Sequence, residues 1–173
     1  MAQIIKYGAL TQDNWQLLEQ DSTGALPFRG DVIVPLALWA SERDTLSFRL
    51  GRIGVWLEAD ADPEAIAQHV ARFDVIAVRF TSFVDGRGYT LARLLRERHG
   101  YRGELRAIGD VLRDQLYYLS RCGFDAFALR ADQDPERALS ALDDFSEAYQ
   151  ASVERPEPLF RRRLESNPHS KAA

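Results

Sequence analysis

Residues 75–88 read VIAVRFTSFVDGRG and residues 104–114 read ELRAIGDVLRD, and these two stretches decide the fold. Each begins with a segment of strand length that is rich in apolar residues and passes directly into a loop carrying glycine and charge. Each loop is followed by a segment whose leucines recur at helical intervals. Strand, charged loop and helix in this order are typical of a parallel sheet with helical crossovers.

The same alternation extends along the chain on both sides of these stretches. We expect strands at residues 31–38, 52–57, 75–80, 104–108 and 124–129, each followed by a helical segment. Five successive strand–helix units predict an α/β fold with a mainly parallel sheet, right-handed crossovers and flanking helices. An open three-layer sheet and a truncated (β/α) barrel both fit this pattern, and the order of the strands stays open.

Local signals predict where the helices begin and which faces they bury. Ser41 is expected to cap a helix that runs to about residue 50, and the pairs Asp62-Pro63 and Asp134-Pro135 mark two further helix starts. The helix from Asp134 is expected to bury a stripe that ends at Phe145 and Tyr149.

The two ends of the chain differ from its middle in their pattern of apolar and polar residues. Residues 4–10 and 15–18 are strand-like and flank a polar turn at 11–14, which predicts a β-hairpin. We therefore divide the chain into a hairpin and loop (1–30), an α/β domain (31–150) and a partly disordered tail (151–173). The exposed edge of the hairpin would allow a homodimer.

The composition excludes several classes of protein. The chain has 173 residues, 46% of them hydrophobic, and a formal net charge of -4. The acidic balance argues against nucleic-acid binding, because such proteins carry a basic surface. No apolar run approaches the roughly 20 residues of a membrane span, and the start MAQIIKY lacks the form of a signal peptide. We expect a cytoplasmic protein that binds neither nucleic acid nor a membrane.

Cys122 is the single cysteine of the chain. One thiol can neither close an internal disulfide nor hold zinc or an iron–sulfur cluster alone. Its place at a predicted helix end disfavours a thiolate, so a packed structural thiol is expected. The three histidines show no metal-binding spacing, and we predict no metal site. Redox chemistry would require an organic cofactor, whose identity is unknown, or a partner protein.

Three loops are predicted at the carboxyl ends of neighbouring strands, where parallel α/β folds bind ligands. They comprise residues 81–89, 109–114 and 130–132. Glycines at a helix start let backbone N–H groups approach an anion, and an arginine adds a planar fork for a carboxylate, phosphate or sulfur oxyanion. The predicted ligand-binding residues are Thr81, Ser82, Gly86, Arg87, Gly88, Tyr89, Gly109, Asp110 and Arg113.

Asp85 and Asp114 are the candidate catalytic acid or base of this site. A purely structural alternative exists for each loop. DGRG at 85–88 is also a tight turn with a helix cap, Asp110 is also a cap, and Arg113 and Asp114 could pair across two helices. The loops match neither the GxGxxG dinucleotide fingerprint nor a P-loop.

Several motifs together resemble one bacterial family. They are DGRGY (85–89), ARLLRER (92–98), GELRA (103–107), GDVLRDQ (109–115) and RCGFD (121–125), with IIK (4–6), Trp15, VPL (34–36) and YQ (149–150) in support. The family is a domain of unknown function that is often labelled an oxidoreductase probably involved in sulfite reduction. The resemblance covers most of the chain. Relatives usually have proline where this chain has Thr81, so the resemblance places the loop without carrying over its rigidity.

The resemblance implies a part in assimilatory sulfate reduction, because the family's genes tend to lie beside those for sulfite reductase and sulfonucleotide reduction. It implies an accessory protein that binds the reductase, its electron donor or a small anion. It carries over no catalytic residues. Sulfite reduction normally needs a sirohaem coupled to an iron–sulfur cluster, which one cysteine cannot ligate. The residues themselves allow an alternative, a small enzyme acting on a phosphorylated or carboxylated metabolite. A flavin would be compatible with its fold.

Overall fold

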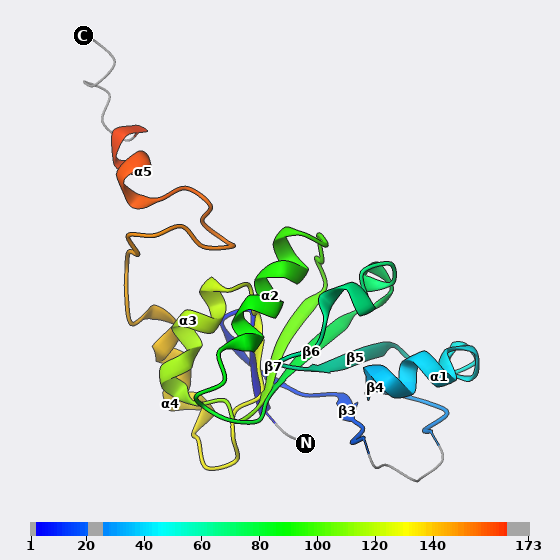
Figure 1. The fold of residues 1–173 in the computed structure, drawn as a ribbon. Helices are drawn as coiled ribbons and strands as arrows, with labels where there is room; N and C mark the ends of the chain where they lie inside the picture. The colour runs from blue at the N-terminus through cyan, green and yellow to red at the C-terminus, as the bar shows by residue number, and fades with distance from the viewer. Residues whose placement is uncertain (1–2, 21–25, 166–173) are drawn as a thin grey trace.

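The computed structural model describes residues 3–20 and 26–165 of the chain (Figure 1). One eight-stranded sheet runs in the order β2-β1-β8-β7-β6-β5-β4-β3. Its strands are β1 (Gln3–Lys6), β2 (Ala9–Gln12), β3 (Trp15–Leu17), β4 (Asp31–Pro35), β5 (Ile53–Glu58), β6 (Val75–Phe80), β7 (Glu104–Gly109) and β8 (Ala126–Phe127). The helices are α1 (Leu36–Ser47), α2 (Arg87–Glu97), α3 (Leu116–Arg121), α4 (Pro135–Leu139) and α5 (Leu159–Glu165). Short 3-10 turns are η1 (Pro63–Ala65), η2 (Val70–Arg72), η3 (Arg113–Gln115) and η4 (Ser140–Asp143).

The predicted parallel α/β fold is confirmed, and it takes the barrel-like form. Strands β3 to β8 are all parallel and lie beside one another in chain order. When each right-handed crossover moves to the next strand in the same direction, every helix falls on the same face of the sheet. Helices α1, α2, α3 and α4 accordingly bury their side chains in one apolar cluster with the outward residues of the strands.

The opposite face of the sheet is concave and holds its own, smaller apolar cluster. It consists of Ile33, Trp56, Val75, Ala77 and Ile108, with Trp15 and Ala128 packed against it. These residues alternate with those of the helix-facing cluster, as strand geometry requires. Because no residue of α1 to α4 belongs to this cluster among the described residues, the concave face must be covered by something else.

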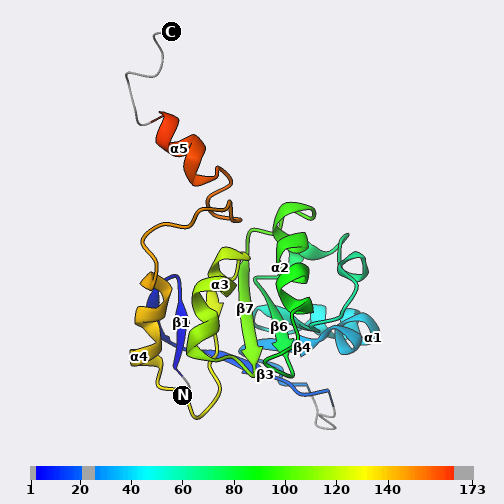
Figure 2. The same ribbon diagram turned by 60° about the vertical axis from the view of Figure 1, so that its left-hand side comes forward.

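The strand edges show how strongly the sheet curls. β2 and β3 occupy opposite edges of the sheet, yet only Asp13 and Asn14 separate them. Three residue steps span at most about 11 Å, so the two edges approach each other. In Figures 1 and 2 the blue segment between β1 and β3 passes behind β7 and β6, on the side away from α2 and α3. The amino-terminal segment between β1 and β3 therefore covers part of the concave face.

The amino-terminal hairpin exists, but its predicted turn is wrong. The hairpin turns at Tyr7 and Gly8, both at positive φ, and pairs β1 with β2 antiparallel. Of the predicted turn residues 11–14, the first two belong to β2, and Asp13 and Asn14 carry the chain to the other edge of the sheet, where Trp15 pairs in parallel with β4. A single short run of polar residues cannot distinguish a turn from a crossing, because only the tertiary structure decides between them.

Two predicted helices are also corrected. Helix α1 begins directly after Pro35 rather than at Ser41, whose hydroxyl donates to the Leu38 carbonyl at 3.1 Å. The segment after Asp62 forms two 3-10 turns instead of one α-helix. Asp62 still caps the first of them, since its carboxylate accepts from Glu64 N at 2.9 Å.

The last predicted helix is shorter than its apolar pattern indicated. Asp134 caps α4 as predicted, but the helical segment ends by Asp143, and the Phe145 and Tyr149 side chains are largely exposed. Beyond it the chain leaves the body, and α5 projects away from the sheet (Figures 1 and 2). The predicted disorder of residues 166–173 lies outside the described residues. Among those described, no helix has the length and apolar character to cross a membrane.

Candidate functional site

The loops after the carboxyl ends of β3, β5, β6, β7 and β8 form one surface, which we call the mouth. Its charged side chains are organised around three arginines, each held by carboxylates. Arg79 pairs with Glu19, Arg87 with Asp85 and Asp60, and Arg130 with Asp110 and Asp132. The mouth therefore presents five carboxylates to three guanidinium groups, and this group of charges is acidic.

Arg87 lies between two carboxylates. Its Nε and Nη2 donate to Asp85 at 2.9 and 2.8 Å, and its Nη1 donates to Asp60 at 3.0 Å. The hydrogen bonds from the Arg87 side chain lower the pKa of Asp85 to about 2 and raise the pKa of Arg87 in return. Arg87 also lines an open hollow with Pro63 and Leu94. All three guanidinium nitrogens of Arg87 already donate to carboxylates, so Arg87 is poorly disposed to hold a further anion.

Asp110 joins the three predicted loops. Its carboxylate accepts from Phe83 N at 3.1 Å and from Arg130 Nη1 at 2.6 Å. Arg130 donates its other nitrogens to Asp132 at 2.7 and 2.9 Å, and these bonds lower the pKa of Asp132 to about 2. The loops 81–89, 109–114 and 130–132 thus lie side by side. Asp110 does this by bridging loops, not by capping the helix that follows it.

The glycines of the predicted site have different roles. Gly88 is buried, and a Cβ there would meet the Phe80 ring at 2.7 Å, so it allows α2 to approach β6 closely. Gly109 has a φ of +91°, and a Cβ would meet the Phe80 carbonyl oxygen at 2.3 Å. Gly86 is open, with nothing near its Cβ position. Two of the three glycines are therefore explained by packing and backbone conformation.

The remaining predicted residues spread around the mouth. The Tyr89 ring packs against Phe80, and its hydroxyl accepts from Gln115 Nε2 at 3.2 Å. Arg113 turns the other way and donates to Asp144 at 3.3 Å. Thr81 and Asp114 are exposed and Ser82 is half-buried. The structure brings Asp85 to Arg87 and Asp110 to the first loop, but it directs Arg113 to the side of η4.

The concave face holds charged residues that the sequence analysis missed. Arg106, on β7, donates its Nε to Glu104 at 2.7 Å and its Nη1 to Asp13 at 2.9 Å. Glu104 also pairs with Lys6 at 2.6 Å. The Arg106 and Glu104 side chains are only 3% and 4% exposed. The available signal was a strand whose charged residues at 104 and 106 alternate with Leu105 and Ala107, in a sheet expected to be apolar on both faces.

Arg106 lines a hollow of about 250 Å³ within the curled sheet, which we call the inner hollow. Its wall also includes Asp13, Leu17, Ile33, Ile108 and Arg130. The hollow reaches the mouth through Gly109, Arg130 and Ala131, which belong to loops at the carboxyl ends of the strands. This is where barrels of this class carry their binding sites.

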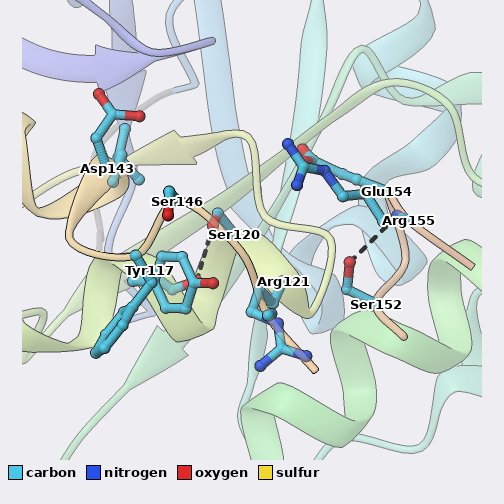
Figure 3. Close-up of a pocket in the computed structure, with 11 residues that line it drawn as sticks. Tyr117, Ser120, Arg121, Asp143, Ser146, Ser152, Glu154 and Arg155 are labelled. Atoms are coloured by element: carbon cyan, nitrogen blue, oxygen red, sulfur yellow. Dashed lines mark hydrogen bonds between the residues drawn. The ribbon is translucent and has the colours of Figure 1, made fainter. Parts of the chain in front are cut away.

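A further hollow, of about 430 Å³, lies between α3 and the tail. Figure 3 shows Ser120, Ser146 and Ser152 around it and the side chains of Arg121 and Arg155 pointing to different sides. Ser120 donates to the Tyr117 carbonyl at 2.8 Å, and Ser152 accepts from Arg155 N at 3.2 Å. Because the charged groups do not converge on one point, this hollow is a weaker candidate for a binding site than the inner hollow.

Fold and mouth together define a class: a small α/β protein with a curled parallel sheet, open at the carboxyl ends of its strands. The chain belongs to a bacterial family of unknown function, described as "Bacterial protein of unknown function (DUF934)", whose sequence model matches residues 54–160. The match runs from β5 into α5 and so includes all three predicted loops. A search of curated proteins gives no match.

Proposed function

We propose that this protein is an accessory protein of assimilatory sulfite reduction, and that it docks through its mouth on sulfite reductase or on the reductase's electron donor. The resemblance described above supports the pathway, and the surface of the mouth supports docking. The observation that carries the docking proposal is the tip of the loop after β6. Phe83 and Val84 stand 50% and 86% exposed there, beside the charged pairs of Arg87 and Asp110.

Exposed apolar side chains inside a charged rim are typical of protein–protein contacts. Here the rim has an excess of carboxylates, so the partner surface should be basic with an apolar recess for the tip. The Asp110 carboxylate accepts a hydrogen bond from Phe83 N and so fixes the position of the loop tip before a partner binds. A rigid apolar tip with complementary charge around it supplies both affinity and orientation.

The residues also argue against a role as the catalytic subunit of the reductase. Cys122 is buried, and burial raises the pKa of its thiol, so it is suited to packing and not to ligation. Asp85, the first candidate base for the alternative enzyme, has a pKa of about 2 and is a weak base at neutral pH. Neither Cys122 nor Asp85 therefore supports catalysis, and we take the mouth to be a binding surface.

Binding of the purified chain to sulfite reductase holoenzyme and, separately, to its electron donor tests the proposal. Val84→Asp should weaken binding to one of them by about tenfold or more, because it places a charge in an apolar contact. Phe48→Asp is the matched control, because it places the same charge on another exposed apolar residue. Phe48 is 77% exposed but follows α1 at the other end of the strands, so its replacement should leave binding unchanged.

Raising the salt concentration should also weaken the complex, because the charged rim is screened. The proposal fails if neither partner binds the wild-type chain, or if Val84→Asp and Phe48→Asp weaken binding equally. Normal growth of a deletion strain on sulfate as the sole sulfur source would contradict the assigned pathway.

A further inference from the structure

The inner hollow contains a guanidinium group with one unused donor. Arg106 donates hydrogen bonds from its Nε to Glu104 and from its Nη1 to Asp13. Within the described residues, its Nη2 has no hydrogen-bond partner. Nη2 is also not among the polar atoms that are fully buried without a partner, so it keeps some accessible surface. Arg106 lines the inner hollow, and we take Nη2 to be the atom that faces it, because the other two nitrogens of this buried guanidinium are bonded to carboxylates. A ligand oxygen in the inner hollow would gain a charge-assisted hydrogen bond from this donor.

The charges around Arg106 sum to zero but leave its Nη2 free to donate a hydrogen bond. Lys6, Glu104, Arg106 and Asp13 form a chain of alternating sign, with Lys6 at 2.6 Å from Glu104. The chain is balanced without a ligand and fixes the guanidinium plane from two sides. Buried ion pairs are often replaceable by apolar residues without loss of stability, so stability alone does not account for this chain.

The wall of the inner hollow selects the kind of acceptor. Leu17, Ile33 and Ile108 present apolar side chains, while the Asp13 carboxylate lies beside the free donor. A nearby carboxylate repels a second negative charge, and an apolar wall gives no hydrogen bonds to a fully hydrated ion. A volume of about 250 Å³ corresponds to about eight water molecules. These features favour a singly charged molecule with a short apolar body.

We propose that the inner hollow binds the anion of a small organic acid, a carboxylate or a sulfonate, with one oxygen accepting from Arg106 Nη2. The site goes beyond the docking function proposed above. It lies inside the curled sheet, whereas Phe83 and Val84 lie on the outer tip of the mouth. The two proposals can therefore fail independently.

NMR titration of the full chain tests this site, with propanoate and propane-1-sulfonate as organic probes and sulfate and sulfite as inorganic ones. The amide signals of Ile108, Gly109 and Arg130 should shift and saturate with the organic probes at lower concentrations than with the inorganic ones. Arg106→Lys should weaken this binding by about tenfold or more, because a lysine cannot hold the forked geometry. Ala131→Phe, at the exposed entrance, should block it without altering the charges.

Arg93→Gln is the control, since Arg93 lies exposed on α2 and pairs only with Glu97 among the described residues. It should bind the probes as the wild type does, and so should Val84→Asp. If Arg106→Lys does not fold, as judged by circular dichroism, Ala131→Phe alone decides. Absence of saturable shifts in the wild type, stronger binding of sulfate or sulfite than of the organic probes, or unchanged binding in Ala131→Phe would overturn the proposal.

Discussion

Asp85 and Arg87 are two residues apart, and their side chains form a two-point ion pair on the surface of the mouth. The sequence analysis interpreted DGRG as an anion-binding loop or as a tight turn with a helix cap, and it did not predict this pair. The pairing of Arg87 with Asp60 could not be predicted from local sequence, because Asp60 comes from another loop. Similarly, Gly88 was recognisable as an important position, but the sequence pointed to a ligand, while the structure shows the Phe80 ring. Local sequence indicates that a residue is special more reliably than it indicates what the residue touches.

The Asp85 carboxyl should titrate at a pH of about 2, because Arg87 stabilises its charged form. In Arg87→Gln the pKa should rise toward the ordinary value of 3.8. Since the pKa is lowered in the folded state, any stability this pair provides is present above about pH 4 and is lost as the pH falls toward 2. Carboxyl carbon chemical shifts measured by NMR across this range check the prediction. An unchanged pKa in the variant would show that Arg87 is not the cause.

Cys122 should react slowly with iodoacetamide in the native protein and fully after unfolding. Its side chain is buried, and burial raises its pKa, so little thiolate is present at neutral pH. Mass spectrometry of labelled protein with and without urea measures the difference. Rapid labelling in native buffer would contradict the structural role assigned to this thiol.

At the scale of elements, strands were easier to predict than the segments between them. β6 has the predicted bounds, and β7 extends only one residue further. By contrast, residues 36–38 of the predicted strand 31–38 belong to α1, and β8 covers only Ala126–Phe127 of the predicted 124–129. The predicted hairpin turn and the helix after Asp62 failed for a common reason. Polar residues at 11–14 and the cap at Asp62 are compatible with several local structures, and packing of the whole chain selects one.

Gly109→Ala should destabilise the fold by about 1–3 kcal/mol or more, because the residue has a φ of +91° and its Cβ would meet a backbone carbonyl. Gly86→Ala serves as the matched control. Gly86 has a φ of -83° and open space around it, so its free energy of unfolding should change by at most about 0.5 kcal/mol. Urea denaturation monitored by circular dichroism compares the two. Equal effects would contradict the conformation given for the end of β7.

Arg96 connects α2 to the amino ends of the neighbouring strands. Its guanidinium donates to the carbonyls of Tyr101, Gly103 and Gly123 and to the Asp125 carboxylate, at 2.6 to 3.0 Å. Arg96→Ala should cost about 3–5 kcal/mol, because it leaves Asp125 half-buried without its cation. Arg93→Ala, on the exposed face of the same helix, should cost less than about 0.5 kcal/mol. Thermal unfolding of both variants tests this contrast, which a similar loss in each would refute.

At the scale of the whole molecule, the sequence predicted an α/β class but left two architectures open. The order of strands decides between them, and it depends on contacts between residues far apart in the chain. The inner hollow could not be predicted for the same reason. Arg106 and Asp13 are separated by 93 positions, and only the curl of the sheet brings them together. Three predicted loops at one end of the sheet, by contrast, followed from the direction of parallel strands.

The central claim is that the mouth is the surface through which this protein acts on a partner. Hydrogen–deuterium exchange of the full chain, with and without sulfite reductase holoenzyme or its electron donor, tests it most directly. We predict that one of these partners slows exchange in residues 81–89 and 109–114 and leaves residues 46–52, at the opposite end of the strands, unchanged. Protection confined to residues 46–52, or no protection with either partner, would contradict the claim.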